Sequence, residues 1–107
     1  MYTKTETQLR LRNSWKYVGE KRWDWSVFLE DDGSGEMDKV VSVRYILHPS
    51  FANPRRLKTN KEEKFALKTN GWGVFMIRAF VQTEEGEKIR LEHYLHLSYD
   101  PKEGVTD

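Results

Sequence analysis

The sequence predicts an all-β domain, an immunoglobulin-like β-sandwich of about seven or eight antiparallel strands. Apolar and polar side chains alternate with a period of two along most of the chain, which is typical of strands that bury one face. Clusters of Gly, Asp, Asn and Pro separate these segments, and no segment carries an amphipathic helical stripe. With 107 residues, the chain is long enough for one core and too short for two domains. We therefore expect a single domain over residues 1–107, with its core in about 8–99 and a polar tail at 101–107 that frays.

The most regular alternation lies in residues 39–47. There Val41, Val43, Tyr45 and Leu47 would all point toward the core, because alternate side chains of a strand share one face. The other segments with strand character are residues 7–15, 23–29, 63–68, 74–82 and 88–97. Segment 74–82 carries apolar residues on both faces and is expected to be a central strand.

The connections between these segments fit the same fold. Residues 31–35 and 83–86 contain glycines that permit the positive φ of tight turns, and Asn70-Gly71 is a further turn signal. The one candidate for a helical turn lies within residues 57–64. Both Pro49 and Pro54 fall outside the predicted strands, as the missing amide hydrogen of proline requires.

Composition excludes several classes of protein. The chain has no cysteine, which rules out disulfides, thiolate metal sites and a cysteine nucleophile. Its 18 basic and 17 acidic residues give a formal charge of +1, which disfavours direct sequence-specific binding of nucleic acid. No run of 18 apolar residues and no apolar N-terminal stretch is present. We therefore expect no membrane partner and a cytoplasmic location, or a nuclear one in a eukaryotic host.

Few residues suggest catalysis. His93 and His96 are three positions apart on one predicted strand, so they face opposite ways, and we expect His93 to be a half-buried core residue with a polar partner. No phosphate-binding loop, zinc motif or calcium loop is present, and the acidic residues 31–38 read as a solvated hairpin loop. A hydrolase that uses His48 and Ser50 is the least favoured alternative, because no third catalytic group can be named. We therefore expect no enzymatic activity, no metal and no cofactor.

Two motifs remain after this screening. Residues 48–54, HPSFANP, place Phe51 in a loop between two prolines with Ser50 beside it. Residues 71–73, GWG, place Trp72 between two glycines, which let another chain or a ligand approach the backbone closely. From the residues alone, the more common explanation is that Phe51 and Trp72 cap the open end of the core.

Three segments together resemble the YEATS domain family in order, spacing and residue type. They are VVSVRYILHPSFANPRR at 40–56, KFALKTNGWGVFMIRAFVQ at 64–82 and KIRLEHYLHLSYD at 88–100. The similarity extends over roughly residues 8–99 and points to a divergent, prokaryotic form of the domain. The resemblance implies an immunoglobulin-like sandwich that recognises acylated lysine, acetyl or crotonyl, typically on histone tails.

The resemblance also implies roles for particular residues. The acyl amide would lie between the rings of Phe51 and Trp72, with a hydrogen bond to Ser50 and a second one from the backbone N–H of Trp72 or Gly73. Glu92 would contact the basic chain that flanks the modified lysine. The implied ligand-binding set is His48, Ser50, Phe51, Gly71, Trp72, Gly73, Phe75 and Glu92.

The chain departs from the family pattern in several places, one of which is near Lys21, where an aromatic residue of some members has no counterpart. Residues 57–65, LKTNKEEKF, lack the usual pair of prolines, and Trp23 stands where the family has a histidine. The expected partner is an acylated-lysine peptide or protein, and the domain could belong to a longer multidomain chain. The alternative is a protein-interaction or sensory module with the same fold and a different, non-histone ligand.

Overall fold

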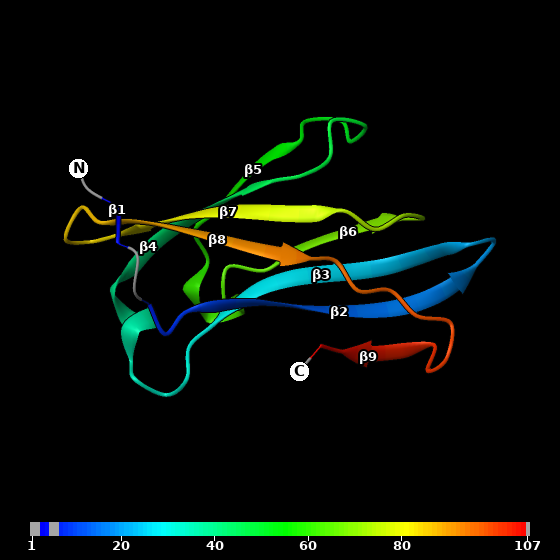
Figure 1. The fold of residues 1–107 in the computed structure, drawn as a ribbon, viewed down its shortest axis with the longest axis horizontal. Coiled ribbons are helices and arrows are strands. Elements are labelled where there is room, and N and C mark those ends of the chain that lie inside the picture. Colours follow the sequence, from blue (N-terminus) through cyan, green and yellow to red (C-terminus); the bar gives the residue numbers. More distant parts are fainter. Residues whose placement is uncertain (1–2, 5–6, 107) are drawn as a thin grey trace.

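The computed structural model describes residues 3–4 and 7–106, which form two facing β-sheets (Figure 1). One sheet has the strand order β1-β8-β7-β4-β5 and the other the order β6-β3-β2-β9. The strands are β1 (Thr3–Lys4), β2 (Arg10–Gly19), β3 (Arg22–Glu30), β4 (Val40–Ile46), β5 (Arg55–Lys58), β6 (Leu67–Gly71), β7 (Met76–Thr83), β8 (Lys88–Tyr94) and β9 (Glu103–Val105). This confirms the predicted all-β, immunoglobulin-like sandwich. The pairings are antiparallel apart from β1, which lies parallel to β8.

The core fills the space between the sheets and is built from alternate residues of each strand. In β3 the predicted pattern holds, and Trp23, Trp25, Val27 and Leu29 are all buried. Strand β7 lies in the middle of its sheet, between β8 and β4, as its apolar composition predicts. Its inward residues are Ile77, Ala79 and Val81. Burial of side chains of this kind stabilises the fold by about 1.5–3 kcal/mol for each large apolar residue.

The prediction of which β4 residues face the core is wrong at the start of the strand. Val43, Tyr45 and Leu47 are buried as expected, but Val41 is 50% exposed and Val40 is buried instead. The pairing of β4 with β7 shifts register between Val40 and Ser42. A bulge of this kind inserts one residue and reverses the alternation on its far side.

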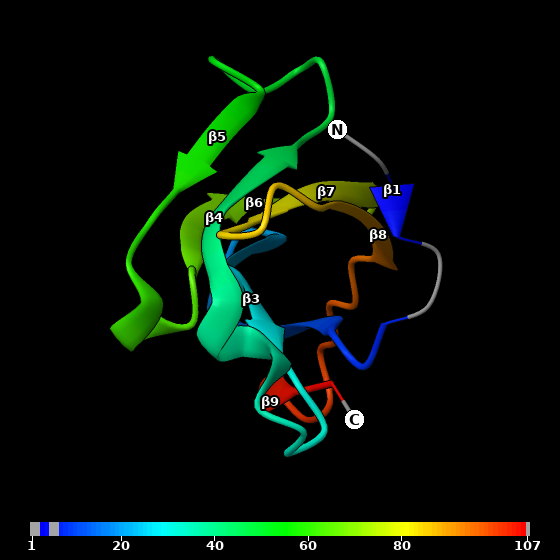
Figure 2. The ribbon, with the colours of Figure 1, turned by 90° about the vertical axis from the view of Figure 1, so that its left-hand side faces the viewer.

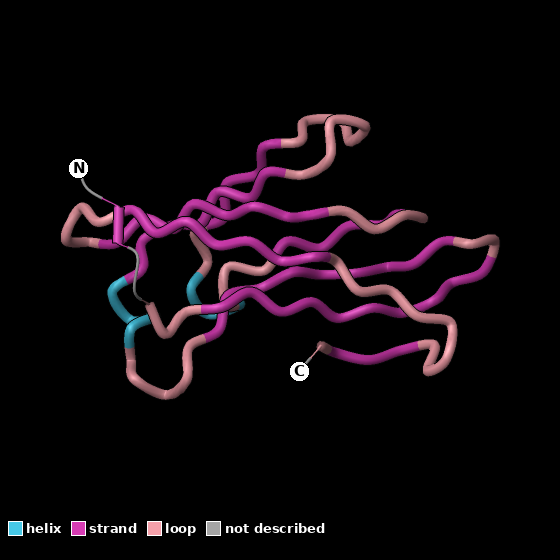
Figure 3. Tube along the Cα trace, viewed as in Figure 1, coloured by secondary structure: helices cyan, strands magenta, loops and turns pink. Residues whose placement is uncertain are grey.

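The strand predicted at residues 63–68 begins too early. Residues Lys61–Glu63 form a short 3₁₀ helix, one of two drawn in cyan in Figure 3, and β6 starts only at Leu67. The Asn60 side chain accepts the Glu62 backbone N–H and caps this helix. Lys64 and Phe65 then adopt positive φ values of 57° and 56°, which an extended strand cannot contain. The predicted helical turn within 57–64 is therefore confirmed at its C-terminal half, whereas β5 was not predicted.

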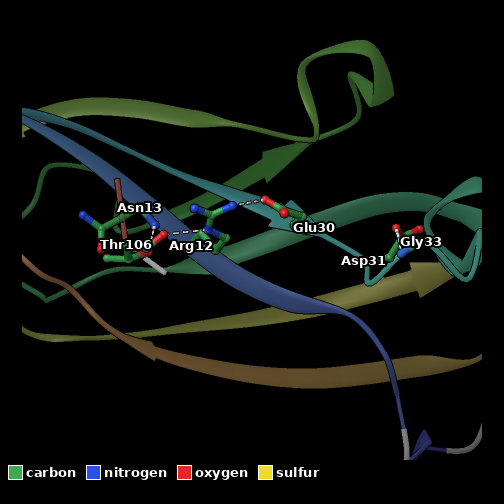
Figure 4. A network of polar contacts seen from close by, with 6 residues as sticks. All are labelled: Arg12, Asn13, Glu30, Asp31, Gly33 and Thr106. Carbon is green, nitrogen blue, oxygen red and sulfur yellow. Dashed lines mark hydrogen bonds and ion pairs between the residues drawn. The ribbon is translucent and has the colours of Figure 1, made fainter. Parts of the chain in front are cut away.

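The expectation that residues 101–107 fray is wrong for Glu103–Val105, which form β9 and pair with β2. Figure 4 shows the contacts of Thr106, the residue after this strand, with Arg12 and Asn13 of β2. Asn13 and Thr106 exchange two hydrogen bonds: the Asn13 N–H donates to Thr106 Oγ1 at 3.0 Å, and the Thr106 N–H donates to the Asn13 carbonyl at 2.9 Å. Arg12 donates from Nε to the Thr106 carbonyl at 2.7 Å and pairs with Glu30 at 2.8 Å.

Asn13 also joins the two sheets through its buried side chain. Its Nδ2 donates to the His96 carbonyl at 2.8 Å, and its Oδ1 accepts the His96 N–H at 3.1 Å. His93 Nε2 lies 2.7 Å from the same Oδ1. His93 is half-buried and hydrogen-bonded, as predicted, and burial together with the nearby charge of His96 lowers the pKa of His93.

Neither short helix of residues 3–4 and 7–106 has the length or apolar character needed to cross a membrane.

Candidate ligand-binding site

Two loops and one turn meet at the same end of the sandwich. In Figure 1 the loop after β4 (residues 47–54), the loop after β6 (residues 72–75) and the β2–β3 turn all extend toward the right-hand end. The first loop is closed at its base, where the Leu47 N–H donates to the Pro54 carbonyl at 2.7 Å. Arg56 fastens the tip by donating to the carbonyls of Asn53 and Ala52 at 2.6 and 2.9 Å. The loop is therefore held in one shape by its own hydrogen bonds.

A cavity of about 400 Å³ opens between these loops. Its lining consists of Arg22, His48, Ser50, Phe51, Ala52, Asn70, Gly71, Trp72, Gly73, Val74 and Phe75. Seven of the eight residues that the sequence nominates therefore surround one space, although they come from two separate loops. The eighth, Glu92, does not line it.

The floor of the cavity is aromatic and rests on the buried Trp25. The rings of Phe51 and Phe75 lie 5.5 Å apart, and each meets Trp25 edge-on, at 6.3 and 6.0 Å between centroids. Edge-to-face contacts of this kind contribute about 0.5–1.5 kcal/mol each beyond area burial. These contacts leave Phe51 half-buried and fix the orientation of its ring.

Gly71 is buried beside this floor. A Cβ atom at this position would lie 3.4 Å from Trp25 Nε1 and 3.7 Å from Phe51 Cζ. The Trp25 indole N–H is buried there and has no hydrogen-bond partner among the described residues. Gly73, by contrast, has no atom within 4 Å of the same position, so its surroundings are open. The two glycines that flank Trp72 therefore lie in different surroundings, Gly71 against the aromatic floor and Gly73 in open space.

Trp72 is 72% exposed, whereas Trp15, Trp23 and Trp25 are buried. Within residues 3–4 and 7–106, no other aromatic ring contacts the Trp72 indole. The explanation that both loop aromatics cap the core thus fits Phe51 in part and does not fit Trp72. One wall of the cavity is anchored, and the other stands in solvent.

His48 and Ser50 form a compact polar pair beside the aromatic floor. The Ser50 backbone N–H donates to His48 Nδ1 at 3.1 Å, and Ser50 Oγ lies 2.9 Å from the same nitrogen. Because Nδ1 accepts the backbone N–H, the Ser50 hydroxyl is the donor in the second contact. The lone pairs of Ser50 Oγ then remain free to accept a hydrogen bond from a ligand. The His48 ring also packs against Phe75, at 6.1 Å between centroids.

Sequence reasoning missed Arg22 and Asn70, which complete the rim. Arg22 Nε donates to Asn70 Oδ1 at 2.7 Å, and Asn70 Nδ2 donates to Asp24 Oδ1 at 2.7 Å. The antiparallel pairing of β3 with β6, which sets Asp24 opposite Asn70, brings these residues together. No local pattern in the sequence indicates that pairing. The cavity consequently carries a cation that the sequence analysis did not place there.

Glu92 lies on β8, opposite Arg78 of β7. Its carboxylate is 3.8 Å from Arg78 and 3.8 Å from Arg90, all on the solvent face of the sheet. Its side chain therefore faces two arginines rather than the cavity.

The described residues hold no group of three or more His, Asp or Glu side chains placed to bind a metal ion. The residues that line the cavity also include no carboxylate that would orient His48 as a base. The arrangement offers stacking surfaces, a hydroxyl acceptor and, at the rim, the Arg22 cation. Such a set suits the binding of a flat group that forms hydrogen bonds.

Comparison with known proteins agrees with this architecture. Residues 23–96 match the family described as the prokaryotic YEATS domain. Transcription initiation factor TFIID subunit 14 of Schizosaccharomyces pombe is 32% identical over 85 residues, which cover 72% of this chain and 33% of that protein. The chain therefore spans about a third of the length of this curated relative.

The solved structures that resemble the fold include the yeast AF-9 homolog Yaf9, with a TM-score of 0.70 and 23% identity over 94% of this chain and 76% of that one. The Yaf9 YEATS domain bound to H3K27ac has a TM-score of 0.71 and 21% identity, covering 96% of this chain and 82% of that one. The Yaf9 YEATS domain recognising an H3K122suc peptide has a TM-score of 0.62 and 22% identity, covering 96% and 83%. These similarities concern the fold. Together with the family match, which extends over well more than half of the chain, they lead to one conclusion: this protein belongs to the prokaryotic YEATS domain family.

Proposed function

We propose that the protein is a recognition module that binds an acylated lysine side chain in the cavity between the loops 47–54 and 72–75, without transforming it. The observation that carries this proposal is the pairing of an anchored ring, Phe51, with an exposed ring, Trp72, around one cavity. A ring that is 72% exposed and has no aromatic neighbour is available to stack on a ligand.

The chemistry of an acylated lysine suits this cavity. Acylation removes the ammonium charge, so that the side chain can leave water without the large cost of desolvating an ion. The amide is planar and can stack between two ring faces, each contact contributing about 0.5–1.5 kcal/mol beyond area burial. Its N–H can donate to Ser50 Oγ, and its carbonyl can accept from the backbone around Gly73. Two such hydrogen bonds add about 1 kcal/mol each.

The relatives support the same ligand class. One solved Yaf9 YEATS domain is bound to H3K27ac, and another recognises an H3K122suc peptide. The acyl group that this chain prefers depends also on Arg22, which contributes a cation to the cavity. That cation favours an acyl group ending in a carboxylate as a second candidate ligand.

Isothermal titration tests the proposal with matched peptides that carry acetyl-, crotonyl-, succinyl- or unmodified lysine. We expect micromolar binding of an acylated peptide, about −8 kcal/mol, and no measurable binding of unmodified lysine. Phe51→Ala and Trp72→Ala should each weaken binding by about tenfold or more, equivalent to about 1.4 kcal/mol. Arg22→Gln should weaken succinyl-lysine more than acetyl-lysine if the carboxylate is read.

A suitable control is Phe28→Ala, which removes an aromatic side chain from the outer face of β3, near Arg12 and Lys64 and outside the cavity. This variant should bind as the parent does. Absence of binding at millimolar concentrations of every acylated peptide would rule out the acyl-lysine proposal. It would favour the alternative, a module of the same fold with a different ligand.

A further inference from the structure

The outer face of the five-stranded sheet carries a second hollow, separate from the cavity described above. It has a volume of about 510 Å³ and lies on strands β8, β7, β4 and β5. Figure 2 shows how this sheet curls across its width, with β5 turned away from β7 and β8. The hollow is lined by Ser42, Arg44, Ile46, Arg55, Leu57, Arg78, Phe80, Gln82, Lys88 and Arg90. We call it the β5–β8 groove, and it shares no lining residue with the cavity.

Strand register arranges cationic and apolar side chains in alternation across this groove. Arg90 pairs with Phe80, Phe80 with Arg44, and Arg44 with Leu57, which gives one row that crosses all four strands. The neighbouring row runs from Arg78 through Ile46 to Arg55. Directly opposed residues of an antiparallel pair have their Cβ atoms about 4.5–5.5 Å apart. Ile46 and Phe80 therefore each lie between two arginines, and Leu57, on the edge strand, lies opposite one.

Charge is concentrated here although the chain as a whole is nearly neutral. The groove is lined by five cationic residues and no acidic one, whereas the formal charge of the whole chain is only +1. Within residues 3–4 and 7–106, Arg44, Arg55 and Lys88 form no ion pair. Glu92, at the edge, lies 3.8 Å from both Arg78 and Arg90. Uncompensated like charges repel one another, so this arrangement costs stability unless an anionic partner neutralises it.

The apolar residues decide which kind of anion fits. Leu57 is 55% exposed at one end of the row, and Ile46 and Phe80 are half-buried along the floor. Nucleic acid would use the cations and a stacking ring, but it would leave the two aliphatic side chains without apolar partners. An extended peptide that carries acidic and apolar residues on the same face matches both kinds of side chain at once.

We propose that the β5–β8 groove binds an extended acidic segment of a partner protein, in which acidic and large apolar residues follow one another at every second position and so share one face. Three inter-strand steps of about 4.8 Å span about 14 Å, which four to five extended residues cross at about 3.3 Å each. Acidic side chains contact the arginines, and apolar side chains cover Leu57, Ile46 and Phe80. The site is independent of the acyl-lysine cavity, so a partner protein can occupy it while the cavity is filled.

Fluorescence anisotropy tests this proposal with a fluorescein-labelled peptide of about eight residues that carries aspartate and leucine in turn at every second position, with serine between them, so that both share one face. We expect saturable binding that weakens as salt is added, because exposed charges are screened. The double variant Arg44→Gln/Arg55→Gln should weaken binding at least tenfold, and Leu57→Ser about threefold. These side chains are exposed or near the surface, so the variants should fold as the parent does.

Matched controls separate this groove from non-specific charge attraction. Arg10→Gln/Lys16→Gln removes two exposed cations of β2 in the other sheet, and Trp72→Ala alters only the cavity; neither should change the affinity. Equal binding of a peptide with serine in place of leucine would overturn the proposed apolar contacts. Tighter binding of oligo-deoxythymidine, lost in the same double variant, would make the groove a nucleic-acid site instead. An unaffected double variant would also overturn the proposal.

Discussion

Tyr45 illustrates how one buried hydroxyl holds a difficult stretch of backbone. Its side chain is fully buried, and its O–H donates to the Phe65 carbonyl at 2.8 Å. Phe65 follows Lys64, and both adopt left-handed backbone conformations that are rare for bulky residues. Burial raises the pKa of Tyr45, so the hydroxyl stays protonated and remains a donor throughout the neutral range.

We expect Tyr45→Phe to lower the free energy of unfolding by about 1–3 kcal/mol, because the buried Phe65 carbonyl loses its partner. Urea denaturation followed by circular dichroism measures this change. Tyr94→Phe, at a tyrosine that is 59% exposed, is the control and should stay within about 0.5 kcal/mol of the parent. If the two variants proved equally stable, the Tyr45 hydrogen bond would not be what secures this turn.

At the level of single residues, sequence patterns identify most inward-facing positions and fail where register changes. Alternation correctly places Val43 and Tyr45 in the core. A bulge at the start of β4 buries Val40 in place of Val41, which is exposed. Such a bulge depends on pairing with β7, which no pattern within β4 encodes. Phe65 was expected inside a strand for the same reason, since its left-handed backbone depends on a distant contact with Tyr45.

Among the strands, β9 shows how a polar sequence can be ordered by packing. Residues Glu103–Val105 contain no apolar alternation, yet they pair with β2 at Ser14, Trp15 and Lys16. Gly104 makes this docking possible, because its backbone lies against the Trp15 ring. The Trp15 indole N–H also donates to the Pro101 carbonyl at 3.1 Å. A tail judged by composition alone would be treated as unstructured.

Gly104→Ala should therefore destabilise the protein by about 1–3 kcal/mol, the usual cost of overpacking. A Cβ atom at this position would lie 2.6 and 2.8 Å from two carbons of the Trp15 ring, closer than real contacts allow. The matched control is Val105→Ala, one residue along the strand and 48% exposed, which should have little effect. Thermal melting of both variants measures the difference. A Gly104→Ala variant as stable as the parent would mean that β9 can leave β2 at no cost.

The two loops of the candidate site were identified from sequence, and the strand pairings around them were not. Phe51 and Trp72 stand out because each lies where a core residue is not needed, and the family resemblance then connects them. Arg22 joins them only because β3 pairs with β6. The family resemblance assigned Glu92 to the chain that flanks the ligand, and its strand position alone does not show the two arginines beside it. Loop motifs can be read locally, whereas cross-strand neighbours need the topology.

Across the whole molecule, Asn13 connects β2, the segment after β8 and the C-terminal segment in one hydrogen-bonded cluster. Its side chain bonds to His96 and contacts His93, while its backbone exchanges hydrogen bonds with Thr106. Because His93 lies on β8 of one sheet and Asn13 on β2 of the other, the cluster couples the two halves of the sandwich. The polar side-chain atoms of Asn13 are buried and hydrogen-bonded. Removal of one partner would leave a buried polar atom without a hydrogen bond, which lowers the stability of the fold.

This cluster predicts a pH dependence of stability. The pKa of His93 is lowered in the folded protein, mainly by burial and also by His96. The unfolded chain, with an ordinary histidine pKa of about 6.5, therefore binds a proton before the folded one does as the pH falls. The free energy of unfolding should be unaffected by this group above about pH 6.5 and should decrease below it, down to the lowered pKa.

Denaturant titrations at neutral and mildly acidic pH measure this effect in the parent and in His93→Gln. Glutamine keeps a donor for Asn13 and cannot titrate, so this variant should lose part of the decrease in stability on acidification. An identical loss of stability in both proteins would show that other groups cause the acid sensitivity.

The unequal burial of the four tryptophans has a practical consequence for spectroscopy. Trp15, Trp23 and Trp25 are screened from solvent inside the sandwich, and Trp72 alone is open to it. A water-soluble collisional quencher such as iodide should therefore reach one indole of the four in the native state. Any molecule that covers Trp72 would protect its emission, and one unmodified sample would then report both occupancy of the cavity and integrity of the core.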